Sequence, residues 1–412
     1  MLVPKLRFKE FNDEWNCKLF SEIFEFIQNN SFSRDMLNYS ENSKIYNIHY
    51  GDILTKYGEI IDFNIISNIV PKINNDISLS KFENKSYLKN GDIIIADTAE
   101  DLTVGKSCEV VNLHCKALAG LHTIPCRPKF KFASQYLGEY INSTSYHSQL
   151  IPYITGIKVS SISKNNIIKT KIYFPTIKEQ EKISELFSLL NKKIELQQRK
   201  IEVLKMYKKG LESKVFNTLS KSTNNKIITE IADTFIGLVT TMTEHYVENG
   251  VRLIRNSDIK ENQFIFNDNI FLDENFANKN CNRKHIIGDI VTVHTGDVGT
   301  SAIIDEKLNG SIGFATIVTR VKNNEIANNK YICWYYNSSI YKNIIKNIIT
   351  GDGRNNLNMK DFNKIKIPLP SIEQQEKISN LFENIKSKIV SCEKEYKVLI
   401  KYKKYLLQQM FI

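Results

Sequence analysis

The sequence predicts an α+β protein in which two globular domains, with mixed and mostly antiparallel sheets, are separated by two long helices that form an antiparallel coiled coil. Three observations predict this architecture. A segment near the middle of the chain recurs at its end, both copies carry apolar residues at heptad spacing, and the regions around them alternate short β-rich runs with polar turns. The 412 residues suit two to four domains at roughly 100–200 residues each.

The repeat is strictest where the helices are expected. Residues 175–187, PTIKEQEKISELF, recur at 370–382 as PSIEQQEKISNLF, an offset of 195. Upstream echoes are shorter: Gly91-Asp92-Ile93 matches Gly288-Asp289-Ile290 at offset 197, and Thr155-Gly156 matches Thr350-Gly351 at offset 195. The offset drifts in one direction, as loops of unequal length would produce, so we predict an internal pseudo-two-fold repeat.

The repeat sets the expected boundaries. We expect the first globular domain at 1–174, the first helix at 175–218, and the second domain and helix at 227–369 and 370–412. The stretch 219–226 is almost entirely polar and is expected to link the two copies.

Each helix is expected to begin with a capping box just after a proline. Thr176 is followed three residues later by Glu179, and Ser371 by Gln374. In this motif, side-chain oxygens at both positions accept from the first free backbone N–H groups of the helix.

The helix interiors predict a coiled-coil seam. Its a and d positions include Ile183, Phe187, Leu190, Ile194, Ile201 and Leu204 in the first helix, and Ile378, Phe382, Ile385, Ile389, Tyr396 and Leu399 in the second. The alternative is that each helix packs on its own domain.

Two lysines favour the antiparallel arrangement. Lys208 and Lys403 occupy equivalent seam positions, so a parallel pair would place two ammonium groups face to face. A register in which facing residue numbers sum to about 586 places Lys208 near Glu376 and Lys403 near Glu181. In that register, a cysteine at 197 is expected to bridge one at 389.

Inside the domains, short apolar runs follow glycine turns. Residues 92–96 and 289–293 are expected to be strands, and 135–142 and 330–337 short helices.

Charge and composition indicate an anionic partner. Lys and Arg number 56 against 45 Asp and Glu, a net charge of +11, which suits nucleic acid but also occurs in proteins that bind none. We see no signal peptide and no run of 18 apolar residues, and the seven cysteines form no Cys-x-x-Cys pair. We therefore expect a cytoplasmic protein without disulfides or a metal site.

Motifs for catalysis are weak. Gly105-Lys106-Ser107 is similar to the tail of an ATP-binding loop, but Glu100 stands where that motif needs glycine. Glu83-Asn84-Lys85 has no convincing acidic partner strand for a nuclease, and the chain contains no Pro-Pro pair of the kind found in amino-methyltransferases. We expect no catalysis by this chain alone.

The repeated helix starts resemble the conserved regions of type I restriction–modification specificity subunits, the HsdS family. The resemblance rests on Phe174-Pro175-Thr176-Ile177 with 179–183, on Leu369-Pro370-Ser371-Ile372 with 374–378, and on the opening 4–8 with Glu14-Trp15. It covers the whole chain.

The resemblance implies two target-recognition domains that each read one half of a bipartite, asymmetric site in double-stranded DNA. It also implies that the paired helices set the spacing of the half-sites and dock two methyltransferase subunits, which motor–endonuclease subunits join for restriction. S-adenosylmethionine, ATP and Mg²⁺ would then belong to those partners, and this chain would bind no cofactor.

Candidate DNA contacts are polar or basic side chains in glycine-opened loops and nearby edges. Arg suits guanine and Asn suits adenine in the major groove, whereas any one of these residues is also explained as a solvated turn or a phosphate contact. The candidates are Arg354, Asn355, Asn356, Lys158, Arg252, Arg255, Asn256, His294, Thr295, Lys106 and Ser107.

Three other interpretations remain open from the sequence. The chain could be a scaffold whose domains bind something other than DNA, a fused methyltransferase–nuclease, or part of a complex that methylates without a motor subunit. Salt-sensitive binding to specific DNA would separate the first from DNA recognition.

Overall fold

The computed structural model describes residues 3–40, 42–156, 158–349 and 356–412. Their contacts divide the chain into two compact units, Met1–Gln198 with Glu395–Ile412, and Arg199–Lys394. Each unit therefore contains one globular domain and portions of both long helices, α7 (Ile177–Ser222) and α13 (Ile372–Gln409).

The first domain is built around a five-stranded sheet in the order β2-β11-β7-β9-β5. The strands are β2 (Phe24–Phe26), β11 (Thr123–Pro128), β7 (Ile93–Ala96), β9 (Ser107–Val111) and β5 (Ile60–Asp62). A four-stranded sheet has the order β10 (Lys116–Ala119), β4 (Ile45–Ile48), β6 (Lys72–Ile73) and β3 (Leu37–Asn38). Two-stranded sheets pair β1 (Asn16–Leu19) with β13 (Lys171–Phe174) and β8 (Thr98–Ala99) with β12 (Ser160–Ser161).

Short helices connect these strands. They are α1 (Phe20–Ile23), α2 (Tyr50–Thr55), α3 (Phe63–Ile66), α4 (Tyr136–Ile141), α5 (Thr144–Leu150) and α6 (Lys164–Ile167).

The second domain has the same plan with different details. One four-stranded sheet has the order β15 (Ala232–Ile236), β24 (Thr316–Val321), β21 (Ile290–Val293) and β22 (Ser301–Ile303), and the other β16 (Tyr246–Val247), β20 (Phe271–Leu272), β17 (Val251–Arg255) and β23 (Ile312–Phe314). Pairs join β14 (Asn225–Ile227) to β25 (Lys366–Pro368) and β18 (Ile259–Lys260) to β19 (Gln263–Phe264). The helices are α8 (Ile228–Ile231), α9 (Glu274–Lys279), α10 (Asn329–Tyr336), α11 (Ser339–Ile348) and α12 (Met359–Phe362).

The predicted fold class is confirmed. Most strand pairs are antiparallel, and parallel pairing joins β10 to β4, β5 to β9 and β17 to β23. The strands expected at 92–96 and 289–293 are β7 and β21, and the short helices expected near 135 and 330 are α4 and α10.

The linker region differs from expectation. Helix α7 continues to Ser222, beyond the expected end at 218, and β14 begins at Asn225. Strand β14 pairs with β25, so the segment 219–226 is largely ordered helix and strand.

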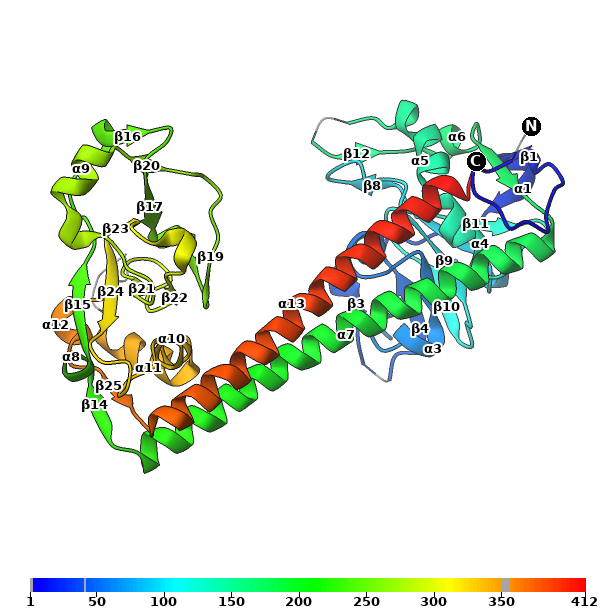
Figure 1. Ribbon diagram of the computed structural model, residues 1–412. Helices are drawn as coiled ribbons and strands as arrows, with labels where there is room; N and C mark the ends of the chain where they lie inside the picture. The colour runs from blue at the N-terminus through cyan, green and yellow to red at the C-terminus, as the bar shows by residue number, and fades with distance from the viewer. Residues whose placement is uncertain (1–2, 41, 157, 350–355) are drawn as a thin grey trace. The chain divides into compact units, whose positions relative to one another are not determined.

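The long helices pack antiparallel, as predicted (Figure 1). In the first unit, the Phe187 ring stacks on Phe411 at 5.7 Å and Gln197 donates to Glu395 at 3.0 Å. Every predicted seam residue is buried or half-buried, because the heptad positions face the partner helix or the adjoining domain.

The predicted register is wrong. Gln197 faces Glu395 rather than position 389, and Lys205 pairs with Glu393 at 2.6 Å in the second unit. Facing residue numbers therefore sum to between 592 and 598 in these pairs, above the expected value of about 586. Aromatic contacts with the domains, such as that of Phe411 with Tyr136, accompany this register and are not encoded by helix periodicity.

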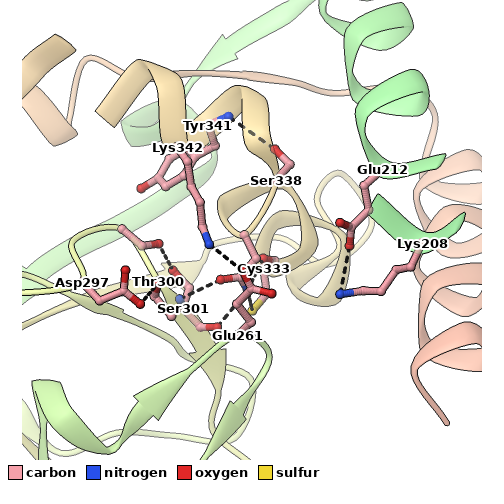
Figure 2. Close-up of polar contacts among 12 residues, drawn as sticks. Lys208, Glu212, Glu261, Asp297, Thr300, Ser301, Cys333, Ser338, Tyr341 and Lys342 are labelled. Atoms are coloured by element: carbon pink, nitrogen blue, oxygen red, sulfur yellow. Dashed lines mark hydrogen bonds and ion pairs between the residues drawn. The ribbon is translucent and has the colours of Figure 1, made fainter. Parts of the chain in front are cut away.

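The seam lysines bind carboxylates, but not those predicted. Lys403 reaches Glu59 at 2.7 Å and Glu139 at 3.4 Å, both in the first domain. Lys208 pairs with Glu212 one turn along its own helix at 3.4 Å (Figure 2). Its ammonium lies 4.9 Å from the centre of the Trp334 ring.

The helix starts also differ from simple capping boxes. The Glu179 carboxylate accepts two bonds from Arg7, each 2.7 Å, instead of returning to its own helix end. At the second start, Ser371 Oγ accepts from the Gln374 backbone at 3.4 Å, so one half of the motif forms.

A buried glutamine anchors each helix start to its domain. Gln180 donates to the Pro175 carbonyl at 2.9 Å and accepts from the Ala133 backbone. Gln375 donates to the Pro370 carbonyl at 2.8 Å and accepts from Asn328 in the same way. Because both amides are buried and each donates to and accepts from the backbone, each helix start is anchored to its domain.

Candidate nucleic-acid interface

Four of the predicted contact residues meet at one corner of the second domain, beyond the end of β21. Thr295 forms a β-bridge with Asn356, and its Oγ1 donates to Asn356 Oδ1 at 2.8 Å. Asn256 accepts from the His294 backbone N–H at 2.8 Å and donates to the Ala315 carbonyl at 3.1 Å. The loops after β17, β21 and α11 are therefore tied together by side chains that sequence analysis selected.

The hydrogen bonds at this corner have a defined direction. Since the Thr295 hydroxyl donates to Asn356, its oxygen accepts from His294 Nδ1, 2.9 Å away. Burial lowers the pKa of His294, so the imidazole is neutral near pH 7. Its Nε2 is then an acceptor, and the exposed Asn356 amide keeps its NH2 donors, which suits the recognition of a base edge.

The next turn of the same loop is closed by its own side chains. Asp297 accepts from the Thr300 hydroxyl at 2.8 Å, and the following residue, Ser301, is held by Asn337 (Figure 2). Lys342 of α11 pairs with Glu261 nearby. These contacts close the loop on itself and tie its end to Asn337, at the end of α10.

The two predicted arginines on β17 are occupied within the domain. Arg255 pairs with Asp258 at 3.1 Å and Asp268 at 3.5 Å, and the Asp258 hydrogen bond raises the pKa of Arg255. Arg252 donates to Asn269 at 2.8 Å and lies over the Phe266 ring at 4.5 Å. Neither joins the corner of Asn256 and His294.

Arg252 instead borders a separate cleft of about 460 Å³, which is also lined by Gln263, Phe264, Phe266 and Lys307.

In the first domain, two candidates have structural positions. Lys106 Nζ donates to the carbonyls of Leu54 at 3.2 Å and Tyr57 at 2.9 Å. Ser107 is fully buried in β9, where its backbone is held by the Asn142 amide. Its selection as a DNA contact is therefore corrected: Ser107 has no surface to offer a ligand.

Lys158 is exposed and lies two residues before β12. Arg354 and Asn355, like Thr350, Gly351 and Ile157, lie outside the described residues, so the selection of Arg354 and Asn355 stays a prediction.

The true counterpart of the second-domain corner was missed in the sequence. Thr98 of β8 pairs with Ser161 of β12, as Thr295 bridges Asn356. Beside it, His122 Nδ1 lies 3.3 Å from Asp97 Oδ1. The counterpart of the His294 loop is therefore the segment after β7.

Two sequence signals could have located this corner. Extending the offset of 197 beyond Asp92 and Asp289 places Asp97 opposite His294. A further echo, Gly120-Leu121-His122-Thr123-Ile124 against Gly313-Phe314-Ala315-Thr316-Ile317, places His122 opposite Ala315. Both residues have positive φ, 54° and 48°, which identifies the same left-handed turn.

Among the described residues, no three His, Cys, Asp or Glu side chains form a group that could hold a metal ion, and no helix is long and apolar enough to cross a membrane. Cys108 and Cys126 form no disulfide and are buried, and burial raises the pKa of both thiols.

Comparison with known proteins agrees with this duplicated plan. A family model for the type I restriction modification DNA specificity domain matches twice, at residues 12–206 and 225–402. The chain is 23% identical over 274 residues to the type I restriction enzyme MjaVIII specificity subunit of Methanocaldococcus jannaschii, which covers 61% of this chain and 64% of that protein. The alignment thus spans somewhat less than two thirds of the relative.

Solved structures share the fold over nearly the whole chain. The type I restriction–modification S subunit from M. genitalium matches with a TM-score of 0.57 and 15% identity, covering 100% of this chain and 99% of that one. A chain from a study of assembly and conformational transition of the type I R-M system matches with a TM-score of 0.62 and 15% identity, covering 96% and 97%. The HsdS subunit from Thermoanaerobacter tengcongensis, also 15% identical, has a TM-score of 0.50 and 96% coverage of both chains.

Proposed function

Because the chain belongs to the family of type I restriction–modification DNA specificity subunits, with two target-recognition domains, we propose that each domain reads one half of a bipartite, asymmetric DNA site. The observation that carries this proposal is the pair of equivalent corners. The same backbone frame presents Thr98 with Ser161 in one domain and Thr295 with Asn356 in the other, and the side chains around the two corners differ. Two recognition domains with the same backbone arrangement but different surface side chains suit two different half-sites.

The chemistry of the corners suits base edges. Amide, hydroxyl and neutral imidazole groups offer directed donors and acceptors, as the major groove requires, whereas phosphate contacts need charge above all. Lys158, exposed two residues before β12, would contact a phosphate, and the net charge of +11 would favour association with DNA.

We propose further that the paired helices set the spacing of the half-sites and dock two methyltransferase subunits. Helix α7 carries exposed apolar residues at intervals of seven, away from the seam: Leu189, Leu196 and Val203 are 62%, 58% and 57% exposed. An exposed apolar stripe of this kind on a helix is typical of a protein–protein contact.

Catalysis belongs, in this proposal, to the partners. Methyltransferase subunits would bind S-adenosylmethionine, and motor–endonuclease subunits, where they join, would use ATP and Mg²⁺. This chain would recognise the two DNA half-sites and set the distance between them.

The test is to map methylated adenines in DNA from cells that express the chain with its methyltransferase subunits. We expect a motif of two dissimilar half-sites separated by a fixed number of unspecified base pairs. A single uninterrupted motif would contradict the proposal, as would methylation that persists unchanged when this chain is omitted.

A further inference from the structure

His122 occupies a special turn in the first domain. It follows Gly120-Leu121, has φ 54°, and directly precedes β11, whose first residue Thr123 donates to the Gly120 carbonyl at 2.6 Å. The turn is part of the frame shared by both domains, because Ala315 has φ 48° before β24. A histidine in this strained backbone region is uncommon, and the equivalent alanine shows that the frame does not need an imidazole here.

The imidazole is held in one orientation. Its Nδ1 lies 3.3 Å from Asp97 Oδ1, and the Asp97 backbone N–H donates to the His122 carbonyl at 3.1 Å. The Thr98 hydroxyl donates to the same carboxylate oxygen at 2.8 Å. The Tyr50 ring meets the imidazole edge-on at 5.2 Å. A side chain that contacts both a carboxylate and a neighbouring ring is suited to directional recognition.

The ring is nevertheless accessible. The His122 side chain is 48% exposed and the Asp97 side chain 28%. A carboxylate only accepts, so the imidazole nitrogen that faces Asp97 carries a proton, and in the tautomer with that single proton Nε2 is an acceptor.

The second domain uses the same two frame positions differently. His294 stands where the first domain has Asp97, and Ala315 stands where it has His122. Interior features of the frame are kept: Arg127 pairs with Asp92 at 2.7 Å, as Arg320 pairs with Asp289. The two domains thus keep the same interior ion pair but carry different side chains at the corner. Such a difference is expected if they recognise different DNA sequences.

We propose that His122, oriented by Asp97, is a specificity-determining residue of the first domain, whose Nε2 accepts from the exocyclic amino group of an adenine or cytosine in the major groove. The inference rests on the proposed function and adds the residue and the chemical group that it recognises. Asp97 acts here as a positioning residue.

The test uses the complex of this chain with its methyltransferase subunits and a plasmid library randomised across the half-sites. His122→Asn is the main variant, because asparagine tolerates positive φ. We expect the base preference at one position of one half-site to fall by about tenfold, within the usual discrimination of a good base contact, while the spacer and the other half-site stay unchanged. Asp97→Asn is expected to relax the same position, since the ring loses its charged partner.

His114→Ala is the matched control. This histidine is exposed in the same domain but lies at the start of β10, whereas His122 lies beyond the end of that strand, and the control should leave both half-sites unchanged. Uniform loss of methylation across all sequences in His122→Asn would indicate a phosphate contact and overturn the inference. An unchanged motif in His122→Asn and Asp97→Asn, both folded by circular dichroism, would also overturn it, while a split wild-type motif would leave the proposed function standing.

Discussion

The Lys403 ammonium lies 2.7 Å from the Glu59 carboxylate, although 344 residues separate them in the chain. Lys403 is near the end of α13, and Glu59 lies just before β5 of the first domain. Glu139, almost fully buried, lies 3.4 Å from the same ammonium and accepts from Asn191 of α7 at 2.6 Å. One lysine thus joins the last helix, the first domain and, through Glu139, the first helix.

Lys403→Met is expected to destabilise the first unit by about 3–5 kcal/mol, because it leaves the buried Glu139 and the half-buried Glu59 without their counter-charge. Urea unfolding would measure the loss. Lys404→Met, the exposed neighbour, is the control and should change stability by less than about 0.5 kcal/mol. Equal effects of the two variants would show that the charge cluster contributes nothing.

Phe216, near the end of α7, and Phe411, just after α13, make equivalent ring contacts in the two units. Phe411 packs against Phe187 and Tyr136, and Phe216 against Phe382 and Tyr335. Phe411→Ala should cost about 3–5 kcal/mol and increase amide exchange in the first unit, whereas Phe216→Ala should do so in the second. Hydrogen exchange of the backbone amides shows which unit loses protection in each variant. Loss of protection in the same unit for both variants would contradict this division of the chain.

The two long helices could be predicted from the sequence because heptad spacing is a pattern of nearby residues. Heptad spacing defines which residues, such as Phe187 and Ile389, are buried, and the repeat shows that both helices follow one plan. The register was not predictable in this way. It depends on the fit of Phe411 and Lys403 into the first domain, and those contacts come from residues far away in the sequence.

The candidate interface was partly predictable for the same reason. Polar loops with glycine drew attention to Asn256, His294, Thr295 and Asn356, which the structure brings together. His122 was missed because it follows a short strand without an obvious polar loop. Ser107 was selected wrongly, since its polar neighbours conceal that β9 is fully buried.

Asn356→Ala is expected to weaken recognition at one or two positions of the second half-site and to spare the first, because Asn356 loses both its amide and its bond to Thr295. Methylation-site mapping would measure the change. Asn324→Ala, exposed elsewhere in the same domain, is the control. Changes in the half-site that responds to His122→Asn would contradict the assignment of one half-site to each domain.

Acid should destabilise the second domain through His285. Burial lowers the pKa of His285 to about 4, below the value near 6.5 expected in the unfolded chain. The unfolded state therefore binds the proton more tightly, so the stability that this group contributes is complete above pH 6.5 and is lost as the pH falls toward 4.

Between pH 7 and pH 5 the free energy of unfolding should fall by on the order of 2 kcal/mol through His285 alone. In His285→Gln this contribution to the pH dependence should be absent. Urea midpoints at the two pH values measure the difference. His245→Gln, with a side chain 41% exposed, serves as the control. An identical pH dependence in wild type and His285→Gln would refute the assignment.

We propose that the paired helices α7 and α13 hold the two target-recognition domains at a fixed spacing. Removing residues 198–204 from α7 and 391–397 from α13 deletes one heptad from each helix and preserves the seam on both sides. At 1.5 Å per residue, the helices shorten by about 10 Å, or about three base pairs of DNA. Mapping methylated sites for this variant should return both half-sites unchanged with a spacer about three base pairs shorter; an active variant with the original spacer would contradict the account.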